Sequence, residues 1–414
     1  MSLTKVSYSM TLEAPANVMD FGAFNDGTNA TATTAAINLA IASGAHAVYF
    51  PRGTYATNAK ITVNSIGTRL YSECHGMLTT YGAVIKYVGS ATSDPMFYVP
   101  TGIHCVEFDG FHFDANSLAR TCVHFDTTTG SATHMPVIRN CYFIGYTSRG
   151  VILGGDSTSV INAGQMQQVI LERLSWRGGD FTAVGLLLNS QNLEFAVCAG
   201  LYFDPDAGRE HSIHVYAFAG GFNVQGLIST RSTQCAVFGQ GSQIIINGWR
   251  SEDVIGLQTS PVGGEGPCTI NGLLNRGVTT ASDDYIDFRY ANTSLSLFGC
   301  KLKGNVRIAN TTDRAVNAIG VDFAGGATFI FEGPQNTRGV THNATTGNFL
   351  LRGSTAVFET MTETGNSGIK VGLQQITMAT TIAAASASNS SIYVETSDGK
   401  LYFKDSGGVA HALY

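Results

Sequence analysis

A short pattern of apolar and small residues recurs nine times between Val106 and Phe323. Each copy has an apolar residue, any residue, a pivot that is usually glycine, an apolar residue, any residue and usually a third apolar residue. Successive pivots are about 26 residues apart on average, a spacing typical of repeat architectures. The nine pivots are Gly110, Asn140, Arg173, Gly200, Gly226, Gly248, Gly272, Gly299 and Gly320.

The positions that flank the pivots keep their apolar character in every copy. Two residues before the pivots stand Phe108, Ile138, Leu171, Cys198, Val224, Ile246, Ile270, Leu297 and Ala318. One residue after them stand Phe111, Cys141, Leu174, Leu201, Leu227, Trp249, Leu273, Cys300 and Val321. Because both columns point inward, the pivot breaks the two-residue period of a strand, and the chain must bend there. Glycine, and next asparagine, takes the positive φ that such a bend needs. Arg173 is the exception: either its coil bends differently or the register shifts there.

One bent pair of strands per repeat, stacked on its copies, describes a parallel β-helix. The sequence therefore predicts an all-β solenoid whose coils keep their size while their turns vary in length. A β-propeller or a sandwich would instead need antiparallel hairpins at short, regular spacing.

Composition narrows the function classes. The 48 glycines and the 13% of charged residues, against a typical quarter, suit a rod of tight turns. The net charge of −6 argues against a nucleic-acid partner. The sequence has no apolar run of the roughly 20 residues that a membrane span needs, and no signal peptide, so we expect a protein made in the cytoplasm without membrane insertion. None of the eight cysteines forms a C-x-x-C pair, and we expect reduced core residues, with no metal and no cofactor.

The N-terminal stretch carries a family resemblance. It contains D-F-G-A at Asp20–Ala23, N-D-G-T at Asn25–Thr28, an Ala-rich helix that Thr33 or Thr34 can cap, and V-Y-F-P-x-G-T-Y at Val48–Tyr55. This order resembles the opening of pectate-lyase-like β-helix proteins, especially bacteriophage tailspikes and capsule depolymerases. The resemblance implies a right-handed parallel β-helix whose short N-terminal helix caps the first coil.

The resemblance also implies how the chain is divided. We expect an attachment segment for other virion tail proteins, a cap with the first coil, the β-helix, and a β-rich C-terminal trimerisation region, at residues 1–17, 18–60, 61–324 and 325–414. The repeat pattern changes after Phe323, and Ser391–Thr396 with Leu401–Lys404 indicates a hairpin. The expected assembly is a homotrimer in the virion tail that acts at the bacterial cell surface.

Stacked coils bring distant residues within about 4.8 Å of each other, so the columns also predict chemistry. Asp204 and Glu252 each lie four residues after a pivot and two coils apart, which separates their backbones by roughly 10 Å. That spacing favours the acid and base of an inverting glycoside hydrolase, about 6.5 to 9.5 Å apart, over a retaining pair at about 5 to 5.5 Å. Asp206 and Asp253 are further catalytic candidates beside them.

Several side chains near these carboxylates are candidates for substrate binding. Arg231, on the intervening coil, would keep a carboxylate ionised or bind an acidic sugar. The full set of candidates is Arg231, Arg177, Arg250, Tyr202, His211 and Tyr216. The same charges could instead form a ladder of surface ion pairs. Trp176 and Trp249 fall on inward columns, and we expect them in the core.

The resemblance implies a tailspike that binds and depolymerises a bacterial capsule or O-antigen polysaccharide, and the paired carboxylates favour hydrolysis. A polysaccharide lyase would need a base beside a uronate-neutralising arginine, which His211, His214 or Tyr216 near Arg209 could supply. A third possibility is a spike that binds its glycan without turnover. The sequence does not identify the sugar, because specificity depends on turns of variable length.

Overall fold

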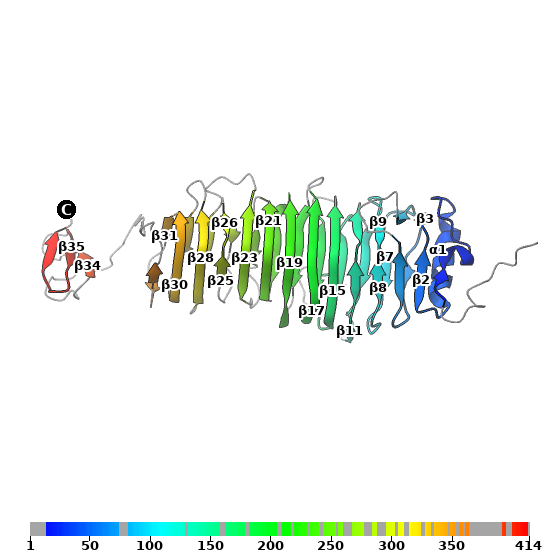
Figure 1. Ribbon diagram of the computed structural model, residues 1–414, viewed down its shortest axis with the longest axis horizontal. Helices are drawn as coiled ribbons and strands as arrows, with labels where there is room; N and C mark the ends of the chain where they lie inside the picture. The colour runs from blue at the N-terminus through cyan, green and yellow to red at the C-terminus, as the bar shows by residue number, and fades with distance from the viewer. Residues whose placement is uncertain are drawn as a thin grey trace, which may run out of the picture.

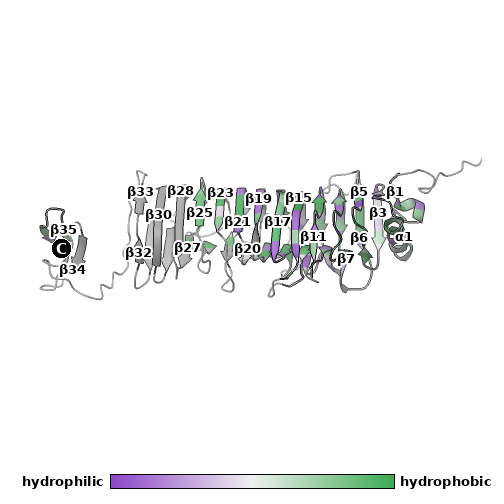
Figure 2. Ribbon diagram, turned by 90° about the horizontal axis from the view of Figure 1, so that it is seen from below, coloured by the Kyte–Doolittle hydropathy of each residue, from purple (hydrophilic) through white to green (hydrophobic). Residues whose placement is uncertain are grey.

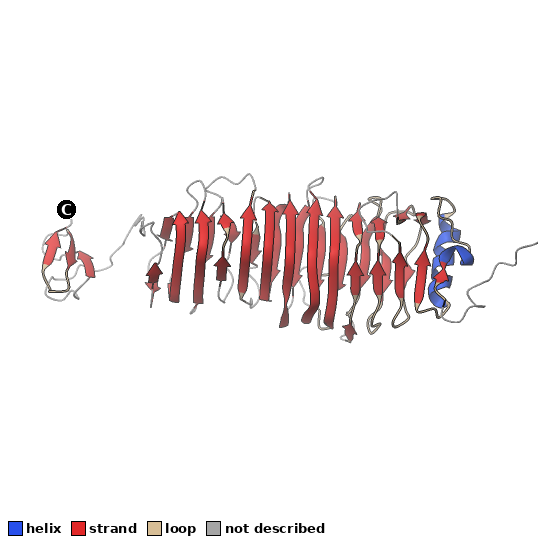
Figure 3. Cartoon of the chain, viewed as in Figure 1, coloured by secondary structure: helices blue, strands red, loops and turns tan. Residues whose placement is uncertain are grey.

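The chain winds into a rod of stacked coils (Figure 1). This computed structural model describes residues 14–412 except 74–81, 129–130, 158–161, 179–181, 205–208, 217–218, 231, 241–242, 254–255, 260–266, 277–283, 288–294, 303–304, 310–313, 324–327, 333–334, 347, 353–355, 359–360, 364–390 and 395–399. Strands dominate the rod, and one α-helix lies at its N-terminal end (Figure 3). No helix among the described residues is long and apolar enough to cross a membrane.

Two long parallel sheets build the described part of the rod. Sheet A contains β1 (Ala16–Asn17), β2 (Ala47–Phe50), β3 (Gly53–Thr57), β5 (Arg69–Ser72), β6 (Ala83–Tyr87), β8 (Glu107–Asp109), β9 (Phe111–Asp114), β11 (Ala132–His134), β12 (Val137–Arg139), β13 (Tyr142–Ile144), β15 (Gln165–Arg177), β17 (Asn192–Asp204), β19 (Ala219–Thr230), β21 (Gln243–Glu252), β23 (Cys268–Asn275), β25 (Leu295–Phe298), β26 (Lys301–Leu302), β28 (Arg314–Phe323), β30 (Gln335–Thr346), β32 (Ala356–Phe358) and β33 (Met361–Glu363). Sheet B contains β4 (Ile61–Thr62), β7 (Thr92–Val99), β10 (Ala119–Phe125), β14 (Arg149–Gly154), β16 (Val184–Asn189), β18 (Arg209–Tyr216), β20 (Ser232–Gln240), β22 (Leu257–Thr259), β24 (Asp284–Asp287), β27 (Asn305–Ala309), β29 (Thr328–Glu332) and β31 (Asn348–Arg352). Each strand pairs in parallel with its counterpart on the next coil, so the predicted parallel β-helix is confirmed.

The bends fall at the predicted pivots. The first eight pivots, from Gly110 to Gly299, all have positive φ, between 52° and 83°. Arg173 has φ 52°, so its coil bends like the others and the register does not shift there. On either side of these eight bends the flanking apolar residues are at most 4% exposed. The two inward columns are therefore confirmed at these eight pivots, where they form the core of the rod. The side chains beside the ninth pivot, Gly320, lie outside the described ones.

Aromatic side chains stack along the core, three residues after the pivots. The ring centroids of Phe113 and Phe143 are 5.4 Å apart, those of Phe143 and Trp176 5.4 Å, and those of Trp176 and Phe203 4.4 Å, with rings within 25° of parallel. Trp176 and Trp249 are at most 1% exposed, which confirms their predicted place in the core. Figure 2 shows hydrophobic and hydrophilic positions alternating along the described strands, as expected when one face of each strand is buried.

The N-terminal helix covers the end of the rod as expected, but it begins earlier than predicted. Helix α1 (Ala30–Ala42) follows Asn29, and a short 3-10 helix (Val18–Phe21) precedes it. Thr33 and Thr34 are therefore not its caps. Both are buried inside α1, where the Thr33 hydroxyl accepts a hydrogen bond from the Phe24 amide at 3.1 Å. The helix buries Ala36, Ile37, Ala40 and Ile41 against the first coil.

The solenoid does not end at residue 324, and that predicted boundary is wrong. β28 pairs in parallel with β30 at Val316 and Val340, and β30 pairs with β33. In sheet B, Val306, Phe329 and Phe349 are aligned on successive coils. Parallel pairing thus continues to Glu363 although the regular glycine spacing is lost. The predicted hairpin is confirmed: β34 (Ser391–Val394) pairs antiparallel with β35 (Leu401–Lys404), and β36 (Ala410–Ala412) completes a three-stranded sheet. Residues 1–13 of the expected attachment segment lie outside the described part.

Candidate functional site

The exposed pivots of four successive coils form the floor of a groove of about 530 Å³. Because glycine has no side chain, the floor is lower than the outward side chains that stand two residues after each pivot. We call it the glycine groove. Its lining is Gly200, Leu201, Tyr202, Gly226, Leu227, Ile228, Gly248, Trp249, Arg250, Gly272 and Leu274.

The glycine groove runs along the rod axis. Its wall consists of residues that pair in register on adjacent strands: Tyr202 with Ile228, Ile228 with Arg250, and Arg250 with Leu274. Adjacent parallel strands are about 4.8 Å apart, so the four wall residues span about 14 Å. An elongated ligand can lie across several coils at once.

Charged groups surround Tyr202 at the edge of the groove. Arg250 Nη2 is 2.7 Å from Glu252 Oε1, and both side chains are partly exposed. Burial raises the pKa of the Tyr202 hydroxyl, and Asp204 and Glu252 raise it further, whereas Arg250 and Arg177 lower it. The hydroxyl therefore lies within electrostatic reach of two carboxylates and two guanidinium groups.

Arg177 links this group to the preceding coil. It lies in register with Asp204 on the next strand and hydrogen-bonds to the Tyr142 hydroxyl. Of the predicted site residues, the structure thus brings together Arg177, Tyr202, Asp204, Arg250 and Glu252 beside the glycine groove. Asp206 and Arg231 lie outside the described residues.

Asp253 occupies a different environment from its neighbour Glu252. It is fully buried, and the hydroxyls of Ser229 and Ser251 donate to its Oδ2 at 2.6 and 2.9 Å. Ser229 in turn accepts from the indole N–H of Trp249 at 2.9 Å. A carboxylate in this position cannot contact a polymer outside the rod, so the catalytic assignment of Asp253 is wrong in this structure.

The histidines of the alternative lyase set lie on sheet B, whereas sheet A lines the groove. His211 and His214 on β18 are 3% and 4% exposed, with ring centroids 5.6 Å apart. Burial, then His211 and Arg149, lowers the pKa of His214 to about 3, so this ring is neutral near pH 7. Neither ring can bind a polymer at the glycine groove. The Tyr216 side chain lies outside the described residues, although its backbone belongs to β18.

A second group of polar side chains lies along sheet B, and the repeat pattern gave no sign of it. The Tyr98 hydroxyl donates to Asp126 at 2.7 Å, His124 Nε2 is 2.8 Å from the Gly154 carbonyl, and Arg120 is paired with Asp156. Asp126 and His124 are less than 10% exposed. These contacts connect successive coils along sheet B, and none of these residues lines the glycine groove.

Comparison with known proteins adds a partial family match. Residues 16–162 match the family described as rhamnogalacturonase A/epimerase, pectate lyase-like. The chain has a pectate-lyase-like fold. The match spans the stretch Asp20–Tyr55, and the resemblance predicted from that stretch is confirmed. It ends before the coils of the glycine groove. No curated protein matches the chain.

Several solved structures are similar to the chain. The N-terminal fragment of bacteriophage Phi29 gene product 12 has a TM-score of 0.49 and 14% identity, covering 86% of this chain and 71% of that one. Tailspike protein 3 of bacteriophage CBA120 has a TM-score of 0.38 and 13% identity, covering 100% and 72%. PfbA, a surface adhesin of Streptococcus pneumoniae, has a TM-score of 0.42 and 12% identity, covering 96% and 99%.

Proposed function

We propose that this protein is a phage tail spike whose glycine groove binds a bacterial surface polysaccharide and hydrolyses it with Asp204 and Glu252. The observation that carries the proposal is a groove along the rod axis with two carboxylates at its edge. The exposed parts of Ile228 and Leu274 offer apolar surface to the C–H faces of sugar rings, and Tyr202 adds an aromatic ring. Arg250 offers a guanidinium to hydroxyl or carboxylate oxygens.

The two carboxylates have different roles in this proposal. Glu252, which lies 2.7 Å from Arg250, is the base that takes a proton from the attacking water in this proposal. Asp204 would donate a proton to the glycosidic oxygen as the bond to the anomeric carbon breaks. Their placement two coils apart, roughly 10 Å between backbones, leaves room for the water of an inverting reaction.

Product analysis tests the reaction class. The full-length protein is incubated with purified capsule and O-antigen polysaccharides, and reducing ends and the absorbance of unsaturated uronates are followed. We expect new reducing ends without that absorbance. Unsaturated products would indicate a lyase, and binding without products would indicate a spike that only attaches.

Filling the groove floor should weaken binding without unfolding the protein. Asn140 takes φ 53° at a pivot, so asparagine is compatible with the bend. In Gly226→Asn and Gly248→Asn, a side chain would occupy space that is open now, since a Cβ at either position meets no atom closer than 3.9 Å. We expect polysaccharide affinity to fall by about tenfold or more, roughly 1.4 kcal/mol, in titration calorimetry.

The matched control is Gly102→Asn. Gly102 also has positive φ, 80°, with open space around it, and it lies in an early coil away from the groove. The Gly102→Asn variant should bind the polysaccharide as tightly as the unchanged protein does. Unchanged affinity in both groove variants would contradict binding at this floor.

We also propose that the spike is a homotrimer, with residues 325–414 contributing to oligomerisation and residues 1–17 attaching to other tail proteins. The antiparallel sheet β34–β36 offers strand edges that a neighbouring copy could cover. Light scattering of the native protein should give three times the 43.8 kDa chain mass. A monomeric mass would contradict the trimer.

A further inference from the structure

Arg173 is an unusual choice for its position. Of the eight pivots with positive φ, six are glycine and one is asparagine, residues that adopt this conformation readily. Arginine at φ 52° is strained, and its side chain is exposed, so packing in the core does not explain it. At this pivot, burial of the side chain does not offset the strain.

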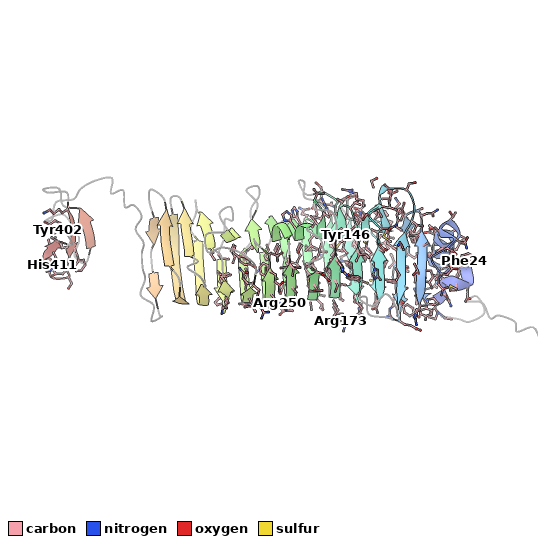
Figure 4. All side chains as sticks on the ribbon, turned by 90° about the horizontal axis from the view of Figure 1, so that it is seen from above. Phe24, Tyr146, Arg173, Arg250, Tyr402 and His411 are labelled. Atoms are coloured by element: carbon pink, nitrogen blue, oxygen red, sulfur yellow. The ribbon has the colours of Figure 1, made fainter. Side chains whose placement is uncertain are left out.

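The Arg173 side chain stands at one end of the glycine groove. A Cβ built on Gly200, the first floor residue, would lie 3.7 Å from Arg173 Cγ and 3.5 Å from its amide nitrogen. Arg173 therefore continues the line of floor glycines by one coil, directly beside the first residue of the groove floor. Figure 4 places Arg173 and Arg250 along the same edge of the rod.

Arg173 can be compared with Asn140, the polar residue at the preceding pivot. At that pivot, Asn140 Nδ2 donates to Asp109 at 2.7 Å, which ties two coils together. In the described part of the chain, Arg173 has no ion pair or hydrogen bond of its guanidinium. Its donors are available to a ligand in the groove.

Cations mark both ends of the groove although the whole chain has a net charge of −6. Arg173 and Arg177 stand on the coil before Gly200, and exposed Lys301 pairs in register with Leu274, the last wall residue. Arg250 lies between them. Arg250 is paired with Glu252, and Arg177 and Lys301 lie in register with Asp204 and Asp322. Among these described cations, Arg173 is therefore the one whose planar fork is open to a carboxylate of a ligand.

We propose that Arg173 is a binding subsite for the carboxylate of an acidic sugar, which fixes where the glycan chain lies along the glycine groove. This inference rests on the proposed function and adds its substrate class, a carboxylate-bearing polysaccharide. Arg173 binds the charged sugar at the end of the groove, and the sugars that follow lie over Gly200 to Gly272.

The test compares uronate-containing capsule polysaccharides with the same samples after their carboxyl groups have been reduced to alcohols. Affinity is measured by titration calorimetry for the unchanged protein, Arg173→Gly and Arg173→Lys. The unchanged protein should bind the carboxylated form at least tenfold more tightly. Arg173→Gly should lose most of that preference while its affinity for the reduced form and its melting temperature do not fall, because glycine relieves the strained φ. Arg173→Lys should recover part of the preference.

Arg52→Gln is the charge-matched control, since it removes one exposed cation near the N-terminal cap, and it should keep the full preference. Equal affinity of the unchanged protein for both forms, or an undiminished preference in Arg173→Gly, would overturn the subsite and leave the proposed function standing. Binding to no polysaccharide in either form would overturn the proposed function and the subsite together.

Discussion

Replacing Asp204 with asparagine and Glu252 with glutamine in the same protein should lower the rate of polysaccharide cleavage by about 10²- to 10⁴-fold, the usual contribution of a general acid and base. Both amides keep the size of the side chain but can neither donate nor accept the proton. The rate is measured as reducing ends released per minute. Binding affinity should change much less than the rate.

The matched control is Glu194→Gln on β17, the strand that also carries Asp204. Glu194 is exposed and accepts a hydrogen bond from Asn192 at 3.1 Å, away from the groove lining. Its cleavage rate should be unchanged. An unchanged rate in the double variant would show that Asp204 and Glu252 are not the catalytic pair.

Replacing Trp176 with alanine should give the largest loss of stability. The ring is fully buried and stacked between Phe143 and Phe203, at 5.4 and 4.4 Å. Removing it leaves a cavity in the column that joins three coils, and a Trp→Ala change in a core costs about 3 to 5 kcal/mol. The measurement is the denaturant midpoint of unfolding.

Trp176→Phe is the comparison for this prediction. The smaller ring keeps the stack, and the indole N–H of Trp176 has no hydrogen-bond partner among the described residues, so no hydrogen bond is lost. The denaturant midpoint of Trp176→Phe should lie much closer to that of the unchanged protein than the midpoint of Trp176→Ala does. A midpoint in Trp176→Ala within experimental error of the original would contradict the stacked core.

The periodic part of the fold could be predicted from the sequence because each coil repeats the same local requirement. Each pivot has positive φ and lies between two inward residues, so glycine or asparagine recurs there in the sequence. Arg173 also has positive φ at its pivot. The end of the solenoid could not be predicted in the same way. Beyond Phe323, parallel pairing continues through Val340 and Phe349 without regularly spaced glycines.

The positions of the site residues could be predicted only for residues at a fixed distance in sequence from a pivot. Arg177, Asp204 and Glu252 lie where their distance from the pivot places them. Asp253 lies one residue beyond β21, where the column rule no longer applies, and its burial depends on Ser229, 24 residues away. His211 was a candidate for substrate binding, but it is buried on sheet B, away from the groove.

Binding of the glycan along the glycine groove is tested most directly by a crystal structure of the Asp204→Asn, Glu252→Gln double variant with an oligosaccharide released from its polysaccharide. We expect sugar rings over Gly200, Gly226, Gly248 and Gly272, with the glycan chain parallel to the rod axis and in contact with Tyr202 and Arg250. An oligosaccharide bound on sheet B or elsewhere, with the glycine groove empty, would contradict it.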